Sequence, residues 1–427
     1  MTFKLKSDFK LGVATSAMQI EGGECNSSWN NWYHKGKIKD GSNPARATDH
    51  YNRWKEDADI MSDMGINIYR FGIEWARICP KENIFDESVI YHYKEEMTYL
   101  KNKGISLLLT IHHFSNPMWF EEKGGFTKSE NNKYYLSFVE HVIRSFGHMV
   151  SEYITINEPN VYATHSYYYG VWPPGEKSLC KTLTVMCNLA VCHIKAYELI
   201  HKMRSKMGYD DTKVSFSNYV RIFDSENPNN TFHILHKNIL ELIFNDLITE
   251  AMYFGHFKFP FIKPSDIKHG EYCDFLAVNY YSRSIVSTFK EGTIQSAHKN
   301  DLGWEIYPDG IIRSAEKLYS LIERPIYITE NGTCDNKDTF RCKYIYEHLK
   351  LLSKTELPIV RYYHWCFCDN FELAEGESAR FGLVHINYDT QKRTIKNSGK
   401  FYSDIIKQRG VTEEIFKKYV KEQEYHF

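Results

Sequence analysis

Eight short apolar runs, separated by longer helical patterns, are the feature that most constrains the fold of this chain. Each run is rich in aliphatic or β-branched residues, which favours a strand. Strands that alternate with helices are typical of a parallel sheet covered by helices. We place the strands at residues 11–17, 66–71, 105–111, 153–156, 213–218, 273–278, 325–329 and 359–364.

The spacing between these runs predicts one continuous domain. Helical patterns with plausible ends occupy the intervals, for example residues 52–64 and 188–203, and residues 336–344 are expected to form a polar loop. No stretch rich in Pro, Gly or Ser divides the 427 residues. We therefore predict an α/β fold, a single (β/α)8 barrel with parallel strands, over residues 1–427.

Charge and cysteine content narrow the partners and the location. The formal net charge is -1, which gives no electrostatic basis for binding nucleic acid. Ten cysteines lack a CxxC pair, so we expect reduced thiols and no metal site. No secretion signal and no uninterrupted apolar run of membrane-spanning length is found. These features predict a cytoplasmic protein without a membrane partner, and they leave a homo-oligomer open.

Polar and aromatic residues follow almost every predicted strand. In barrels of this kind the loops after the strands form the active site, so these residues are expected to share one mouth. Two glutamates stand out: Glu158 follows the fourth strand and Glu330 the seventh. A strand-end glutamate is often only a cap or an ion-pair partner. Two such acids facing each other, however, are what glycosidic bond cleavage requires.

Seven motifs in order make the chain similar to glycoside hydrolase family 1, the β-glucosidase and β-galactosidase family of (β/α)8 barrels. The resemblance covers about residues 9–406 and implies that Glu158 is the general acid/base and Glu330 the nucleophile. The motifs are FKLGVATSAMQIEG at 9–22, YRFGIEWARI at 69–78, TIHHFSNPMW at 110–119, TINEPN at 155–160, NYYS at 279–282, YITENG at 327–332 and DNFELAEGESARFGL at 369–383.

The same resemblance implies a set of residues that bind the nonreducing sugar. Gln19, His113, Asn157 and Glu372 match the positions that hold its hydroxyls, with Asn157 nearest the 2-hydroxyl. Trp365 matches the platform beneath the sugar ring. Any one of these residues could instead satisfy backbone groups at a strand end.

Further positions match residues that support the nucleophile or that lie on the leaving-group side of the site. Arg70 and Tyr281 correspond to the cation and phenol that keep Glu330 charged and aimed. Tyr281 is also counted among the substrate-binding residues. Trp304 matches the family's tryptophan on the aglycone side, in a variable loop where simple packing is an equal alternative.

One departure from the family pattern bears on the preferred sugar. Leu373 stands where a tryptophan that bonds the outer hydroxyls is expected, so the choice among glucose, galactose and fucose stays open. Ser115 and Asn116 replace the more frequent Asp-Leu, outside the reacting centre.

These observations predict a retaining β-glycosidase, a β-glucosidase in the first place. It hydrolyses terminal nonreducing β-D-glycosyl residues of a small-molecule β-glycoside or oligosaccharide through a covalent intermediate, without a cofactor. The alternatives are a 6-phospho-β-glycosidase, a glycosyl transferase and a non-catalytic sugar-binding barrel. The natural aglycone and the oligomeric state are left undetermined.

Overall fold

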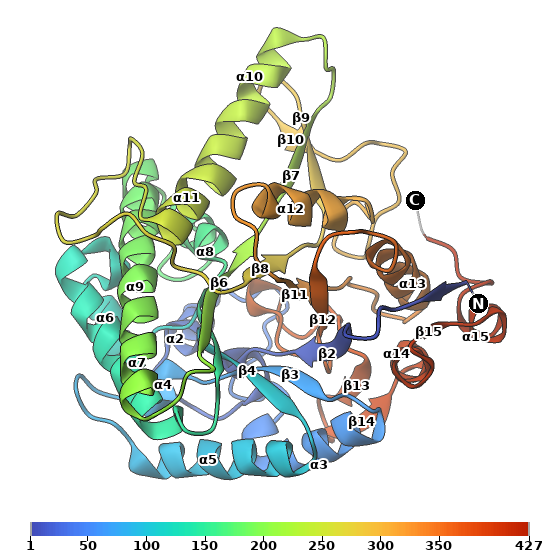
Figure 1. The fold of residues 1–427 in the computed structure, drawn as a ribbon, viewed down its shortest axis with the longest axis horizontal. Helices are drawn as coiled ribbons and strands as arrows, with labels where there is room; N and C mark the ends of the chain where they lie inside the picture. The colour runs from blue at the N-terminus through green and yellow to red at the C-terminus, as the bar shows by residue number, and fades with distance from the viewer. Residues whose placement is uncertain (1, 426–427) are drawn as a thin grey trace.

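The computed structural model describes residues 2–425, and its centre is a closed barrel of eight parallel strands (Figure 1). Neighbouring strands pair in the order β11-β12-β2-β3-β4-β5-β6-β8. This confirms the predicted fold class. The strands are β2 Lys10–Ala14, β3 Ile68–Gly72, β4 Ser106–His112, β5 Glu152–Asn157, β6 Lys213–Tyr219, β8 Leu276–Asn279, β11 Ile326–Asn331 and β12 Ile359–Trp365.

The predicted boundaries need correction at three places. Strand β2 ends at Ala14, because the chain turns into the short helix α1 at Ala17, and β8 begins at Leu276 rather than at 273. The loop predicted at 336–344 ends early, since helix α13 begins at Arg341. The Asp335 carboxylate accepts hydrogen bonds from the N–H groups of Phe340 and Arg341 at 2.8 and 2.9 Å, which stabilises this helix start.

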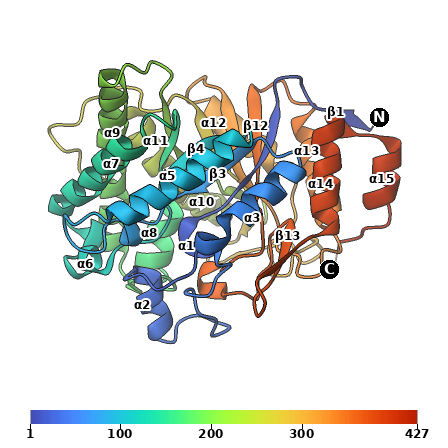
Figure 2. The same cartoon turned by 90° about the horizontal axis from the view of Figure 1, so that it is seen from below.

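Helices surround the barrel (Figures 1 and 2). The predicted helix at 52–64 is α3, and the one at 188–203 is the middle of α9. The helices are α1 Ala17–Ile20, α2 Ser28–His34, α3 His50–Asp63, α4 Trp75–Ile78, α5 Glu87–Asn102, α6 Met118–Glu122, α7 Asn132–Phe146, α8 Pro159–Tyr167, α9 Leu179–Lys206, α10 Thr231–Leu240, α11 Leu247–Phe254, α12 Gly310–Tyr319, α13 Arg341–Leu352, α14 Asn397–Gln408 and α15 Glu413–Tyr419, with a π-helical turn at Glu241–Asp246 and 3-10 turns at Gly125–Thr127, Ser129–Asn131 and Leu373–Glu375.

Helix α9 is long and apolar enough to cross a membrane by length and composition, with a mean hydropathy of 1.3 in its most apolar window. Most of that window, 61%, is buried inside the protein. The helix packs on α7, α8 and α11. Its apolar character is therefore accounted for by its position as a central helix of the outer layer.

Small sheets lie outside the barrel. The strand β1, Phe3–Lys4, pairs antiparallel with β15, Gly410–Val411, which joins the two ends of the described chain. Both chain ends accordingly lie on one side of the molecule (Figure 1). The remaining strands are β7 Ile222–Ser225, β9 Arg283–Val286, β10 Glu291–Gly292, β13 Val384–Asn387 and β14 Lys392–Ile395.

A buried charge cluster holds α3, α5 and β14 together. The His50 ring contacts the carboxylate of Asp57 through Nδ1 at 2.7 Å and that of Glu96 through Nε2 at 2.8 Å. Arg393 donates to Asp57 at 3.0 and 3.1 Å. Burial alone would lower the pKa of His50, but the two carboxylates outweigh it and raise this pKa to about 10. His50 is therefore a permanent cation at neutral pH.

We expect His50→Gln to lower the free energy of unfolding by about 3 to 5 kcal/mol, because it leaves a buried carboxylate without its cation. The folded-state pKa of His50 lies above its unfolded value of about 6.5, so its contribution is complete below that pH and is lost as pH rises towards 10. The difference in melting temperature between the natural protein and His50→Gln should thus be largest at pH 6 and smallest near pH 10. The exposed His269→Gln serves as control. An equal difference at both pH values would contradict this account.

Candidate active site

A cavity of about 200 Å³ opens among the loops at the C-terminal ends of the barrel strands. It brings together most of the residues predicted from the sequence. Arg70 and Asn157 lie in the layer beneath and do not line it. The cavity is lined by Gln19, His113, Phe114, Glu158, Val161, His165, Trp172, Tyr219, Arg221, Phe244, Tyr281, Trp304, Glu330, Trp365, Glu372, Leu373 and Phe381.

Glu158 is held where β5 turns into α8. The strand before it is buried throughout, and Pro159 occupies the first helical position, where a fixed φ and a missing N–H are tolerated. Glu158 itself has φ 41° and ψ 63°, in the left-handed region. A non-glycine residue in this region costs on the order of 1–3 kcal/mol, and such strain is found mostly at functional sites. Its backbone N–H donates to the carbonyl O of Ser217 at 2.8 Å, which fixes the turn.

Glu330 is held by two donors at the end of the buried strand β11. Arg70, from β3, donates through Nη1 to Oε1, and the Tyr281 hydroxyl donates to Oε2 at 2.5 Å. The next turn needs Gly332, because a Cβ there would lie 1.9 Å from the carbonyl O of Trp365. Both oxygens of Glu330 are therefore oriented before substrate binds.

A layer of amides and hydroxyls connects the two carboxyl groups. Asn279 donates through Nδ2 to Glu158 Oε1 at 2.7 Å and to Asn157 Oδ1 at 3.1 Å. The same Asn157 oxygen accepts from Arg70 Nη2 at 2.6 Å. Thr329 donates to Asn279 Oδ1 at 2.7 Å, which fixes the orientation of that amide. The network ties β3, β5, β8 and β11 into one rigid support.

Burial and mutual repulsion separate the protonation of the two acids. Burial, and then the charge of Glu330, raise the pKa of Glu158 well above its ordinary value. Burial also raises the pKa of Glu330, but Arg70 and the Tyr281 hydroxyl act in the opposite direction. This arrangement favours a protonated Glu158 beside an ionised Glu330.

Gln19 and His113 present unused polar atoms to the site. Within residues 2–425, Gln19 Oε1 and His113 Nδ1 are buried without a hydrogen-bond partner. Asn157 donates through Nδ2 to His113 Nε2 at 3.1 Å, and burial holds the pKa of His113 well below its ordinary value. The neutral ring therefore carries its proton on Nδ1, as a donor. One acceptor and one donor are thus available for sugar hydroxyls.

Glu372 lies beside Gln19, whose Nε2 donates to Oε2 at 3.3 Å. Burial, and then the charge of Glu330, raise the pKa of Glu372 to about 8. Leu373 follows with φ 53° and is buried against the cavity. Its side chain forms the part of the wall at which the sequence pattern predicts the indole of a tryptophan.

Aromatic rings form two walls of the cavity. Trp365 is buried and stacks on His113, with centroids 5.6 Å apart and planes at 20°. Trp304 is partly exposed and meets Tyr281 edge to face at 5.8 Å. His112, next to His113, instead contacts Asn116 through Nε2 at 2.9 Å, away from the cavity. Asn116 thereby has a packing function outside the reacting centre.

Sequence reasoning missed Asn279 and Arg221 as site residues. Asn279 donates to Glu158 and is linked to Glu330 through Asn157 and Arg70. Its signal was its place at a strand end, directly before Tyr280 and Tyr281. Arg221 lines the cavity from a segment after β6 that carries no recognisable pattern. Only the folded chain brings it to the site.

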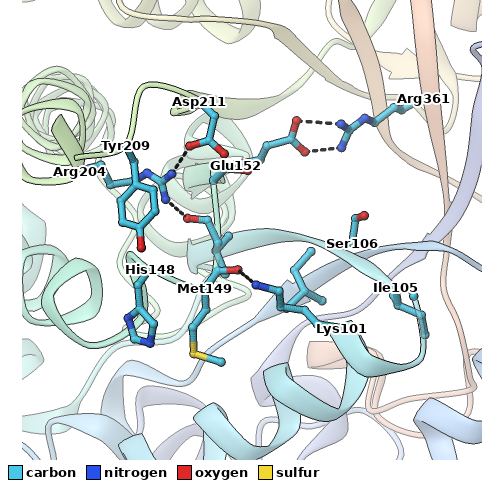
Figure 3. Close-up of a pocket in the computed structure, with 14 residues that line it drawn as sticks. Lys101, Ile105, Ser106, His148, Met149, Glu152, Arg204, Tyr209, Asp211 and Arg361 are labelled. Carbon is cyan, nitrogen blue, oxygen red and sulfur yellow. Dashed lines mark hydrogen bonds and ion pairs between the residues drawn. The ribbon is translucent and has the colours of Figure 1, made fainter. Parts of the chain in front are cut away.

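A second cavity, of about 420 Å³, lies at the opposite end of the barrel (Figure 3). Its charged groups are engaged with each other: Arg361 pairs with Glu152, Arg204 pairs with Asp211, and Lys101 donates to the carbonyl O of Met149. In barrels of this kind, residues at the N-terminal ends of the strands serve the stability of the fold, whereas catalytic residues lie at the C-terminal ends. Over residues 2–425, no cluster of three or more His, Cys, Asp or Glu is arranged to hold a metal ion.

Comparison with known proteins agrees with this geometry. The model of glycosyl hydrolase family 1 matches residues 1–411. Beta-glucosidase A of Thermotoga maritima is 31% identical over 96% of this chain and 99% of its own length. A solved β-glucosidase from Thermotoga maritima in complex with glucoimidazole has a TM-score of 0.87 at 29% identity, over 96% of this chain and all of that one. The β-glycosidase from Pyrococcus horikoshii has a TM-score of 0.90 at 32% identity, over 98% of both chains.

Proposed function

The chain belongs to glycosyl hydrolase family 1, and from that premise we propose that it is a retaining β-glucosidase. It hydrolyses terminal nonreducing β-D-glucosyl residues, and its range extends to related galactosides or fucosides. The observation that carries the proposal is the pair Glu158 and Glu330, which line one cavity and differ in their hydrogen-bond partners.

We propose a double displacement at these two acids. Glu330 attacks the anomeric carbon as Glu158 gives its proton to the leaving oxygen, so the bond to the aglycone breaks as the ester to Glu330 forms. Glu158, now ionised, takes a proton from water, whose oxygen then cleaves the ester. Glu330 is released and the sugar keeps the β configuration. This chemistry requires carboxyl groups about 5 to 5.5 Å apart.

The surrounding residues have proposed roles in binding and positioning. Gln19, His113 and Glu372 hold sugar hydroxyls from the cavity wall, Asn157 reaches the 2-hydroxyl from the layer beneath, and Trp365 supports the ring face. The following residues complete the site: Arg70 and Tyr281 as supports of Glu330, with Tyr281 also touching substrate, and Trp304 on the aglycone side.

The direct test is an assay of purified protein on nitrophenyl β- and α-glycosides, with the first-released anomer identified by NMR. Turnover of the β-glucoside with release of β-glucose supports the proposal. Initial release of the α anomer would refute a retaining mechanism, and an inactive protein that still binds glucose would favour a sugar-binding barrel.

Nitrophenyl β-glucoside 6-phosphate is expected to have a kcat/KM at least about 100-fold below that of the unphosphorylated substrate. The phosphate would enter a buried site beside Glu372. An ionised Glu372 would repel the negative charge of the phosphate. Ala379 and Phe381, which are buried nearby in the same loop, supply no cation. Arg221 is the only Lys or Arg among the residues that line the cavity, and its guanidinium already pairs with Glu291 at 3.4 Å.

The expected discrimination depends on pH, because Glu372 has a pKa of about 8. Below pH 8 the group binds a proton and the repulsion weakens, whereas above it both partners are charged. The kcat/KM for the free glucoside, divided by that for its 6-phosphate, should therefore increase from pH 6.5 to pH 8.5. A phosphorylated substrate that is hydrolysed faster than the free one would favour a 6-phospho-β-glycosidase instead.

We further propose a single domain in a cytoplasmic setting. The pairing of β1 with β15 supports one unit over residues 1–427. All ten cysteines are unpaired, which supports a reducing compartment.

A further inference from the structure

The amides and hydroxyls beneath the two acids form a chain of hydrogen bonds that can run in one direction only. The chain starts at Arg70, because a guanidinium donates hydrogen bonds and cannot accept them. Arg70 Nη2 donates to Asn157 Oδ1 at 2.6 Å. The oxygen of the Asn157 amide must therefore face Arg70, and this fixes the orientation of the whole amide group.

Asn279 takes its orientation from Asn157. It contacts the same Oδ1 atom at 3.1 Å, and since an amide oxygen only accepts hydrogen bonds, Asn279 presents its Nδ2 donor there. Nδ2 also donates to Glu158 Oε1 at 2.7 Å. Oδ1 of Asn279 then faces Thr329, whose hydroxyl donates to it at 2.7 Å. The Thr329 oxygen in turn accepts from the Ser217 hydroxyl at 3.2 Å.

Every member of this chain is sealed from solvent. The exposed fraction is 0% for Arg70, Asn157, Asn279, Thr329 and Ser217. A reversed Asn279 amide would place two oxygens against each other at Asn157, and bulk water could not compensate for the lost hydrogen bonds. The direction that Arg70 sets is therefore kept as far as Glu158.

The two oxygens of Glu158 consequently differ. A proton on Oε1 would face a second donor, because Asn279 Nδ2 has no lone pair with which to accept it. Over residues 2–425, Oε2 has no hydrogen-bond partner, and Glu158 lines the cavity. The acid proton is thus excluded from Oε1 and lies on Oε2.

We propose that Asn279 is a positioning residue that keeps the acid proton of Glu158 on Oε2, the oxygen free to face the leaving group. Arg70 sets this direction through Asn157. The same cation directs a second branch, since Asn157 Nδ2 donates to His113 Nε2 at 3.1 Å and leaves the ring proton on Nδ1. The inference rests on the proposed function and assigns a further residue to that site.

The first test is Asn279→Asp, which keeps the shape of the side chain but replaces the Nδ2 donor with an acceptor. At neutral pH the new carboxyl and Glu158 share one proton between them, so Oε2 carries none. The measured quantity is the leaving-group ratio, kcat/KM for dinitrophenyl β-glucoside divided by that for methyl β-glucoside. Asn279→Asp should raise this ratio on the order of 100-fold at pH 7. The ratio should return towards its natural value as the pH is lowered to 5 and both carboxyls bind protons.

Charged and titrating groups face Glu158 from several elements. Because the nucleophile and the sugar-binding groups serve both glucosides, a change in their protonation alters both kcat/KM values alike. A change in the leaving-group ratio therefore reports the proton of Glu158. The groups are Glu330 of β11, Arg70 of β3, Glu372 after β12, and the phenols of Tyr219 and Tyr281.

Two control variants separate withdrawal of the proton from damage to the site. Asn279→Ala removes the donor without adding an acceptor, and should change the leaving-group ratio less than about tenfold, the effect of one hydrogen bond. Asn218→Asp converts another buried amide, on β6, whose Nδ2 donates to Thr249 at 2.7 Å away from the cavity. It should leave the ratio unchanged even where it lowers stability.

Neutron diffraction of the natural protein at pH 6 gives the direct result and needs no variant. A deuteron is expected on Glu158 Oε2 and on His113 Nδ1. A deuteron on Glu158 Oε1 or His113 Nε2 would overturn the inference. So would a leaving-group ratio that Asn279→Asp leaves unchanged, or one that Asn279→Ala or Asn218→Asp raises equally. The proposed function fails separately, if Glu158→Ala shows no dependence on the leaving group.

Discussion

Replacing Glu330 with glycine is expected to lower kcat on nitrophenyl β-glucoside by roughly 10⁵- to 10⁶-fold, the scale on which loss of a covalent nucleophile acts. No substitute is placed to attack. The Glu372 carboxyl lines the same cavity, but burial, the larger of the two causes that raise its pKa, persists in the variant and disfavours its charged, nucleophilic form. Arg70 and Tyr281 donate hydrogen bonds to Glu330 and are not nucleophiles of comparable strength.

Azide distinguishes loss of the nucleophile from loss of the fold. In the glycine variant azide occupies the vacated position and attacks from the same face, so the product should be an α-glucosyl azide, with inversion. A folded variant with ordinary activity would remove Glu330 from the mechanism. A variant that binds glucose yet yields no azide product would show that Glu330 acts in another way.

Much of the barrel could be predicted from the sequence because each strand is a buried run of apolar residues. The run before Glu330 shows this well, since β11 is buried throughout. The limits of prediction were set by side-chain contacts that the pattern of apolar and polar residues does not display. Asp335 starts α13 through its side chain, a local effect that the polar appearance of 336–344 concealed.

The candidate site was predictable where a side chain follows a strand directly, as with Glu158. The supporting network was less accessible. Asn279 and Thr329 lie on different strands, and nothing in their own surroundings shows that one orients the other.

Replacing Glu158 with alanine should lower kcat/KM by roughly 10²- to 10⁴-fold for a substrate with a poor leaving group, such as methyl β-glucoside. Dinitrophenyl β-glucoside should lose far less, since dinitrophenolate departs without a proton. Azide should yield a β-glucosyl azide, because it attacks the glucosyl ester from the side that water would use. An equal loss on both substrates would contradict a proton-donating role.

The pH profile gives an independent check on the same residue. Burial and the charge of Glu330 raise the pKa of Glu158, so the proton that the leaving group needs is retained at neutral pH and lost as the solution becomes alkaline. The alkaline fall in kcat/KM should therefore disappear in Glu158→Ala when dinitrophenyl β-glucoside is the substrate. The matched control is Glu152→Gln, at the other end of the same strand β5, where the carboxylate pairs with Arg361 (Figure 3). That change should lower stability but keep both the leaving-group dependence and the alkaline fall. If Glu152→Gln altered them as Glu158→Ala does, the effect would arise from the strand as a whole, and Glu158 would lose its assignment as the acid.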